Sequence, residues 1–170
     1  MEIVAETSRL WLKVFAEEDT EAASRFWGDA EVMKQSGGAT ALKRLPKVLE
    51  GYTRCHMENG LSVYAVVEKA TEQVIGCSGF NAVESIGQVE LIYHFSKANW
   101  GKGYASEAVH ACLELAKLHP EVQLVSASAD PDNKGSLRIL EKAGFTFIED
   151  RYFEDTQKTE PYYEYPIGKL

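Results

Sequence analysis

The stretch 99-NWGKGYASEAV-109 decides how this sequence is interpreted. Gly101 and Gly103 stand directly before an amphipathic segment, at a place where glycine adds little to packing. Glycine suits backbone that must turn unusually or approach another group closely. The start of a helix carries unpaired N–H groups and a partial positive charge. The stretch therefore predicts a loop at a helix N-terminus that binds a phosphate group through its backbone.

The segments around this loop follow the periodicities of strands and helices. An apolar run typical of a strand, 88-QVELIYHF-95, precedes the loop. Apolar residues after the loop recur at helical spacing to about Leu118. The order of elements predicts a mixed α/β sheet in one domain, residues 1–170. The other predicted elements are a strand at 9–15, helices from Glu17 to about Trp27 and from about Pro46 to 59-NG-60, a hairpin of 62–68 and 73–80, a strand at 122–128, a short helix that ends at Gly144, and strands at 145–152 and 161–167.

Composition narrows the class of protein. A length of 170 residues with 45% hydrophobic content is typical of one soluble globular domain. The three cysteines are too far apart for a zinc knuckle or a disulfide framework, which favours reduced thiols in a cytoplasmic protein without a metal. No signal peptide or membrane span is visible. The net charge of -8 argues against nucleic acid and is mildly favourable for a cationic partner.

Two common phosphate motifs do not fit the loop. A Walker loop ends in Gly-Lys-Ser or Gly-Lys-Thr, whereas Lys102 is followed by Gly103. A dinucleotide fingerprint needs a third glycine, and Ser106 occupies that position. At this point a plain strand-to-helix turn without a ligand remains the alternative.

Two motifs together resemble the GNAT acetyltransferase superfamily. The pattern Trp100-x-x-Gly103-x-Ala105 follows 90-ELIYHFS-96 and is similar to the family's signature Gln/Arg-x-x-Gly-x-Gly/Ala. The segment 133-NKGSLRILEKAGF-145 resembles its second signature, an Asn-led helix that ends in Glu-Lys-x-Gly-Phe. These forms look most like the branch of the ribosomal-protein alanine N-acetyltransferases. The opening 6-ETSRLWLKVFAEED-19 also resembles that branch, so the resemblance spans essentially the whole chain.

The resemblance implies a twisted, mostly antiparallel sheet of about seven strands flanked by about four helices. Strands 88–95 and 122–128 would form a central parallel pair that splays to admit acetyl-CoA. A bulge near Tyr93 to Ser96 would free backbone groups for the pantetheine arm, and the glycine loop would bind the pyrophosphate. Lys102 would add charge there or remain a solvated surface lysine. The implied cofactor-binding residues are Tyr93, Phe95, Ser96, Trp100, Gly101, Lys102, Gly103, Tyr104, Ala105, Ser106 and Asn133.

The implied chemistry is transfer of an acetyl group to a primary amine by direct attack in a ternary complex. Glu90 is the candidate general base, through water, with a solvent-facing strand carboxylate as the alternative. His94 is a second candidate base. Many family members carry a tyrosine where this chain has Leu140, and Ser136 is the candidate donor that stabilises the thiolate. Asn133 would bind the pantetheine arm or the backbone of the expected bulge, or would be a helix N-cap.

The acceptor stays open between a protein N-terminus and a small-molecule amine. The end of the first helix and its following loop would line the acceptor entrance, or would be ordinary packing; the residues concerned are Phe26, Trp27 and Met33. We expect no membrane association and a monomer or homodimer. Because Leu140 departs from the common pattern, a non-catalytic acyl-CoA-binding or sensing module is the alternative to an enzyme.

Overall fold

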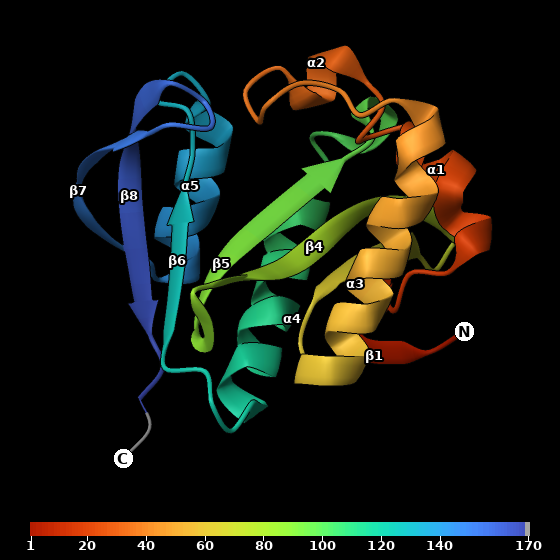
Figure 1. Cartoon of the computed structure of the whole chain (residues 1–170), viewed down its shortest axis with the longest axis horizontal. Helices are drawn as coiled ribbons and strands as arrows, with labels where there is room; N and C mark the ends of the chain where they lie inside the picture. The colour runs from red at the N-terminus through yellow and green to blue at the C-terminus, as the bar shows by residue number, and fades with distance from the viewer. Residues whose placement is uncertain (169–170) are drawn as a thin grey trace.

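A computed structural model describes residues 1–168, so the last two residues of the predicted domain lie outside the described part (Figure 1). Eight strands form one sheet in the order β1-β2-β3-β4-β5-β6-β8-β7. The strands are β1 (Ile3–Glu6), β2 (Leu10–Lys13), β3 (Val63–Glu68), β4 (Gln73–Val83), β5 (Ser85–Phe95), β6 (Leu124–Ser128), β7 (Thr146–Phe153) and β8 (Lys158–Pro166). The α-helices are α1 (Thr20–Ser24), α2 (Ala30–Met33), α3 (Leu45–Asn59), α4 (Tyr104–Leu118) and α5 (Lys134–Ala143).

The predicted mixed α/β fold is confirmed. Neighbouring strands pair antiparallel except β5 and β6, which are parallel. Figure 1 shows α3 on one face of the sheet and α4 on the other, with α5 beside β6. Within residues 1–168, none of the helices has the length and apolar character needed to cross a bilayer.

The structure differs from the prediction in one added strand and one shorter helix. The strand β1 was not predicted, because its four residues are only partly buried and show no clear alternation. The predicted helix from Glu17 to Trp27 is shorter: a 3₁₀ turn precedes α1, which ends at Ser24. The chain then restarts as α2, where the Asp29 carboxylate caps the helix by accepting the N–H groups of Glu31 and Val32.

Both faces of the sheet are covered, which explains the continuous apolar run 63-VYAVV-67 in β3. Tyr64 and Val66 belong to the core against α4, whereas Val63 and Ala65 belong to a second core that includes the apolar side of α3. Since strand side chains alternate between faces, every residue of the run is buried. The same alternation sends the odd-numbered residues of β5 toward α4 and the even-numbered ones toward the opposite face.

Candidate active site

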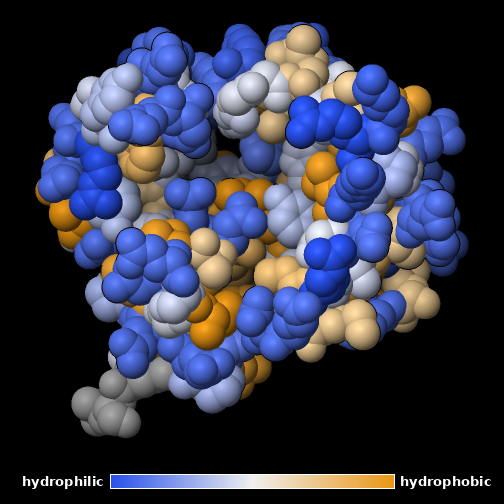
Figure 2. Space-filling view, in the orientation of Figure 1, coloured by the Kyte–Doolittle hydropathy of each residue, from blue (hydrophilic) through white to orange (hydrophobic). Residues whose placement is uncertain are grey.

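The parallel pair β5–β6 opens after three residue pairs. Gln88, Val89 and Glu90 pair with Leu124, Val125 and Ser126, and pairing ends there. Beyond this point β5 continues beside β4, while β6 continues beside β8. Figure 1 shows the two strands diverging from that end, so the predicted splay is confirmed. Figure 2 shows this face of the molecule hollowed between the part that carries α5 and β8 and the part that carries α1 and α2.

The predicted bulge near Tyr93 to Ser96 is wrong. The register between β4 and β5 is regular from Gly76 opposite Phe95 to Ala82 opposite Val89, and its irregularity lies between Ala82 and Val83, at the hairpin end. Backbone groups are nevertheless left free near Tyr93, because β6 departs from the ladder. The divergence of β5 and β6, rather than a bulge, leaves backbone groups of β5 without a strand partner.

The free backbone groups belong to a defined set of residues. The Ser96 N–H donates to the Ile75 carbonyl at 2.9 Å, which fixes the phase of the antiparallel ladder. Alternate residues of β5 therefore bond to β4, and those between them turn their N–H and C=O groups toward β6. Tyr93 is one of the latter, and its N–H and C=O face the gap. The Phe95 carbonyl, also on this side, accepts the indole N–H of Trp100 at 2.8 Å.

The glycine loop leads from β5 into α4 as predicted. Gly101 and Gly103 have φ of 76° and 81°, in the left-handed region that favours glycine. The first helical bond of α4 runs from the Glu107 N–H to the Gly103 carbonyl, so the N–H groups before Glu107 have no partner within the helix. They belong to the first turn of α4, directly after the exposed residues Gly101, Lys102 and Gly103. The geometry fits an anionic group such as a pyrophosphate.

The side chains of other predicted cofactor residues have partners within the protein. The Ser96 hydroxyl donates to the Ile75 carbonyl at 3.1 Å and accepts from the Asn99 amide at 2.7 Å. Phe95 is core, and Tyr104 donates its hydroxyl to Glu68. If these residues contact a ligand, their backbone makes the contact. Trp100 and Ser106 are exposed and Ala105 is half-buried.

Glu90 lies at the last residue pair before the splay, opposite Ser126 on one side and Asn81 on the other. The side chain is half-buried rather than solvent-facing. Burial raises the pKa of this carboxyl above its ordinary value, and the carboxylates of Asp155 and Glu160 raise it further. The carboxyl lines a cavity of about 150 Å³, with Val83, Gln88, Val89, Leu124, Ser126, Arg151, Phe153 and Tyr162.

Tyr93 and Ser136 meet across the gap between β5 and α5. Their hydroxyls share a hydrogen bond of 2.5 Å, and the phenol also lies 3.3 Å from the Ser136 carbonyl oxygen. Burial raises the pKa of Tyr93 to about 12, against a smaller opposing effect of the bond to Ser136. The Asn133 side chain accepts the Ser136 N–H at 3.1 Å, so Asn133 is the N-cap of α5 and orients Ser136. Leu140 is fully buried in the core.

His94 lies on the face opposite Tyr93, as strand alternation predicts. Its Nδ1 accepts the indole N–H of Trp27 at 3.3 Å. Burial lowers the pKa of His94 to about 4. The ring is therefore neutral at physiological pH and a weak base, which favours Glu90 over His94. Phe26, Trp27 and Met33 are buried in the core beside α3, where packing accounts for them.

One group of residues at the loop was not predicted from the sequence. Arg9 and Thr7, from the turn between β1 and β2, bond to Glu107 in the first turn of α4. Arg9 also donates to the carbonyl of Lys102 at 2.9 Å. Arg9 belongs to the opening motif that carried part of the resemblance, but a separation of 98 residues from Glu107 leaves no local signal for the pair.

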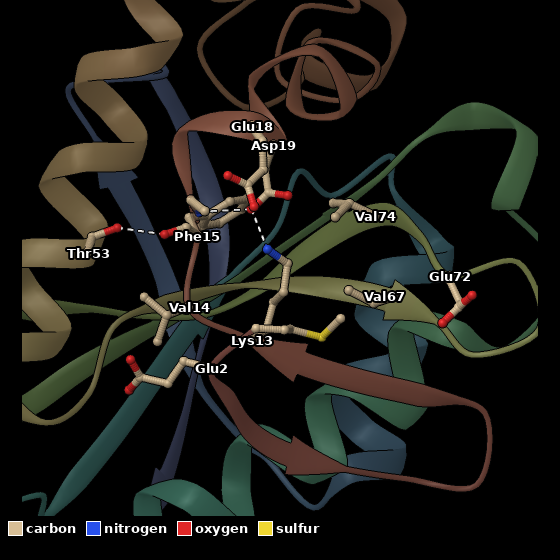
Figure 3. A pocket seen from close by; sticks show the side chains of 12 residues that line it. Glu2, Lys13, Val14, Phe15, Glu18, Asp19, Thr53, Val67, Glu72 and Val74 are labelled. Atoms are coloured by element: carbon tan, nitrogen blue, oxygen red, sulfur yellow. Dashed lines mark hydrogen bonds and ion pairs between the residues drawn. The ribbon is translucent and has the colours of Figure 1, made fainter.

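A larger cavity, about 430 Å³, lies away from the splay (Figure 3). The lysine among its lining residues, Lys13, is paired with the buried carboxylate of Asp19 at 2.5 Å. The remaining ionisable side chains that line it are acidic: Glu2, Glu18 and Glu72. This cavity therefore does not suit an anionic cosubstrate. Within residues 1–168, no cluster of three or more potential metal ligands occurs.

Comparison with known proteins identifies the family. The architecture is that of an acyl-CoA-dependent transferase: a sheet opened at one parallel pair, with a backbone phosphate loop beside the opening. The chain belongs to the GNAT acetyltransferases, since the family model described as acetyltransferase (GNAT) domain matches residues 9–146. It is thus an acetyl-CoA-dependent acetyltransferase, and the non-catalytic alternative is set aside.

Three relatives illustrate the likeness. The uncharacterized N-acetyltransferase p20 of Bacillus licheniformis is 28% identical over 142 residues, which is 82% of this chain and 80% of p20. The ribosomal-protein-S5-alanine acetyltransferase of Vibrio fischeri has a TM-score of 0.83 at 14% identity, covering 97% of each chain. RimL, an alpha-N-protein acetyltransferase solved in complex with coenzyme A, has a TM-score of 0.78 at 17% identity and covers 98% of each chain. The two solved structures share the fold.

Proposed function

We propose that this enzyme transfers the acetyl group of acetyl-CoA to a primary amine by direct attack in a ternary complex. The observation that carries the proposal is the place of Glu90. Its carboxyl stands where the parallel strands part, half-buried and with a raised pKa. A carboxyl placed in this way is suited to accept a proton from an amine that approaches the splay.

Binding of acetyl-CoA is proposed to rest on backbone groups. The free N–H groups at the start of α4 and the exposed Lys102 would hold the pyrophosphate. The N–H and C=O of Tyr93 would bond the pantetheine arm in place of a strand partner. Bound there, acetyl-CoA supplies an acetyl group activated as a thioester.

Glu90 is proposed as the general base. An acceptor amine is protonated in water and must lose a proton to become a nucleophile. A raised pKa makes the Glu90 carboxylate a better proton acceptor than an ordinary glutamate, and a water molecule would relay the proton. The nearby carboxylates of Asp155 and Glu160 favour a positively charged acceptor, in keeping with the net charge of -8.

Ser136 is proposed to stabilise the leaving thiolate. A serine hydroxyl is too weak an acid to protonate a thiolate fully, but it is a good hydrogen-bond donor. The structure adds a partner, because the Tyr93 phenol bonds to the same hydroxyl. We propose that the phenol is the donor of this bond, which would strengthen the donation from Ser136 to the sulfur. Tyr93 thus compensates for Leu140.

The acceptor is proposed to be a protein N-terminus or a small-molecule amine. The names of two structural neighbours, a ribosomal-protein-alanine acetyltransferase and an alpha-N-protein acetyltransferase, support the first class. The test is a thiol-release assay with acetyl-CoA and a panel of acceptors: peptides with free N-termini, polyamines, amino acids and aminoglycosides. Acetyl-CoA turnover that depends on one class supports the proposal. If no amine is acetylated while a non-amine nucleophile is, the proposal is wrong.

A further inference from the structure

The Arg9 side chain makes three contacts at the glycine loop and the first turn of α4. Its Nε donates to a carboxylate oxygen of Glu107 at 2.8 Å, and its Nη1 donates to the Lys102 carbonyl at 2.9 Å. Its guanidinium lies over the ring of Tyr104, 4.5 Å from the centroid. These contacts tie the turn between β1 and β2 to the loop and to the first turn of α4.

The bond to Lys102 sets the direction of one loop N–H. The peptide that joins Lys102 to Gly103 is trans, so its N–H points opposite to its C=O. With the carbonyl turned toward Arg9, the Gly103 N–H is turned away from Arg9. Glycine permits many backbone conformations, and Gly101 and Gly103 stand on either side of Lys102. The guanidinium therefore restrains a segment that glycine would leave free.

Glu107 holds the guanidinium in place. This carboxylate also accepts the backbone N–H of Arg9 at 3.1 Å and the hydroxyl of Thr7. Partial burial raises the pKa of Glu107, but the hydrogen bonds from Thr7 and Arg9 outweigh it, so the pKa is lowered. The carboxylate is thus ionised and fully engaged at the start of α4. It contributes a negative charge close to where we propose that an anion binds.

We propose that Arg9 is a positioning residue for the pyrophosphate-binding loop, held by Glu107 and acting through the Lys102–Gly103 peptide. The inference rests on the proposed binding of acetyl-CoA at this loop. Two roles of Arg9 can be distinguished: a positive charge that attracts the pyrophosphate, and a side chain that positions the loop. If Arg9 acted only as a positive charge, lysine would replace it, and removal of the Glu107 charge would strengthen anion binding. If Arg9 positions the loop, both changes weaken binding.

Calorimetric titration of coenzyme A into wild type, Arg9→Lys and Glu107→Gln separates these roles. We expect each variant to bind coenzyme A about 10-fold more weakly, the size of one lost charge-assisted hydrogen bond. Arg54→Lys is the matched control, since Arg54 pairs with Glu50 on α3, away from the loop. Tighter binding by Glu107→Gln, or unchanged binding by a folded Arg9→Lys, overturns the proposal.

A second measurement excludes a general structural role. S-acetylpantetheine carries the thioester but no pyrophosphate. The ratio of kcat/KM for acetyl-CoA to kcat/KM for S-acetylpantetheine should fall about 10-fold in Arg9→Lys. An equal loss with both substrates would assign Arg9 to the stability of the fold instead. If wild-type protein fails to bind coenzyme A, the proposed cosubstrate site is wrong, a result distinct from failure of the Arg9 role alone.

Discussion

The hydroxyl of Tyr93 lies 2.5 Å from the hydroxyl of Ser136, and this bond joins β5 to α5 across the gap left by the splayed strands. Tyr93 belongs to β5 on one side of the gap, and Ser136 belongs to α5 on the other side. Asn133 orients Ser136 from its own helix through the Ser136 N–H. The pair places a phenol and a serine hydroxyl at the site where we propose that the thiolate leaves.

Replacement of Tyr93 by phenylalanine removes the phenolic hydroxyl and keeps the ring. We expect kcat to fall roughly 10-fold, because Ser136 loses the phenol that we propose as its hydrogen-bond donor. The effects of Tyr93→Phe and Ser136→Ala should be less than additive, since both disrupt one relay. Steady-state kinetics of the two single variants and the double variant measure this. Strict additivity would mean that the two hydroxyls act separately.

Replacement of Glu90 by glutamine should lower kcat by about 10²–10⁴-fold with little change in coenzyme A affinity. A general base works when ionised, so wild-type activity should fall as pH drops through the raised pKa of Glu90. The glutamine variant should lose this acidic limb of the pH–rate profile. His94→Gln is the comparison: its pKa of about 4 already leaves it neutral at physiological pH, so the limb should persist. Full activity of Glu90→Gln at neutral pH would exclude Glu90 as the base.

Replacement of Gly103 by valine should weaken coenzyme A binding while the protein remains folded. Gly103 has φ of 81°, which a β-branched residue adopts only with strain, so the loop backbone must move. Gly37→Val is a control for strain, because Gly37 has a similar φ of 92° but lies in the loop after α2. Calorimetry and thermal unfolding of both variants test this. Equal affinities for a folded Gly103→Val and wild type would remove the loop from the binding site.

Replacement of Asp19 by asparagine should destabilise the fold without a specific effect on coenzyme A binding. Lys13 and Asp19 are 6% and 7% exposed, and the change leaves the ammonium group buried without its carboxylate (Figure 3). Loss of one partner of a buried pair costs about 3–5 kcal/mol in the free energy of unfolding. Urea unfolding measures the change, and Lys13→Met with Asp19→Leu should recover part of it. An unchanged midpoint would show that water reaches the pair.

The order of the main elements and the place of the phosphate loop could be predicted from the sequence. Both depend on local properties: the alternation of apolar residues in β3, the helical spacing after Gly103, and the need for glycine at a left-handed backbone position. The strand β1 was not predicted, because its position at the edge of the sheet leaves none of its side chains fully buried and so gives no clear apolar alternation.

The assembly of the site depends on contacts between residues far apart in the sequence. Whether the backbone at Tyr93 is freed by a bulge or by divergence depends on where β6 finds its other partner, β8, far along the chain. The contacts of Tyr93 with Ser136 and of Arg9 with Glu107 join residues 43 and 98 positions apart. Such pairs leave no periodicity in a single sequence, because the sheet and its helices, rather than local propensity, bring them within hydrogen-bonding distance.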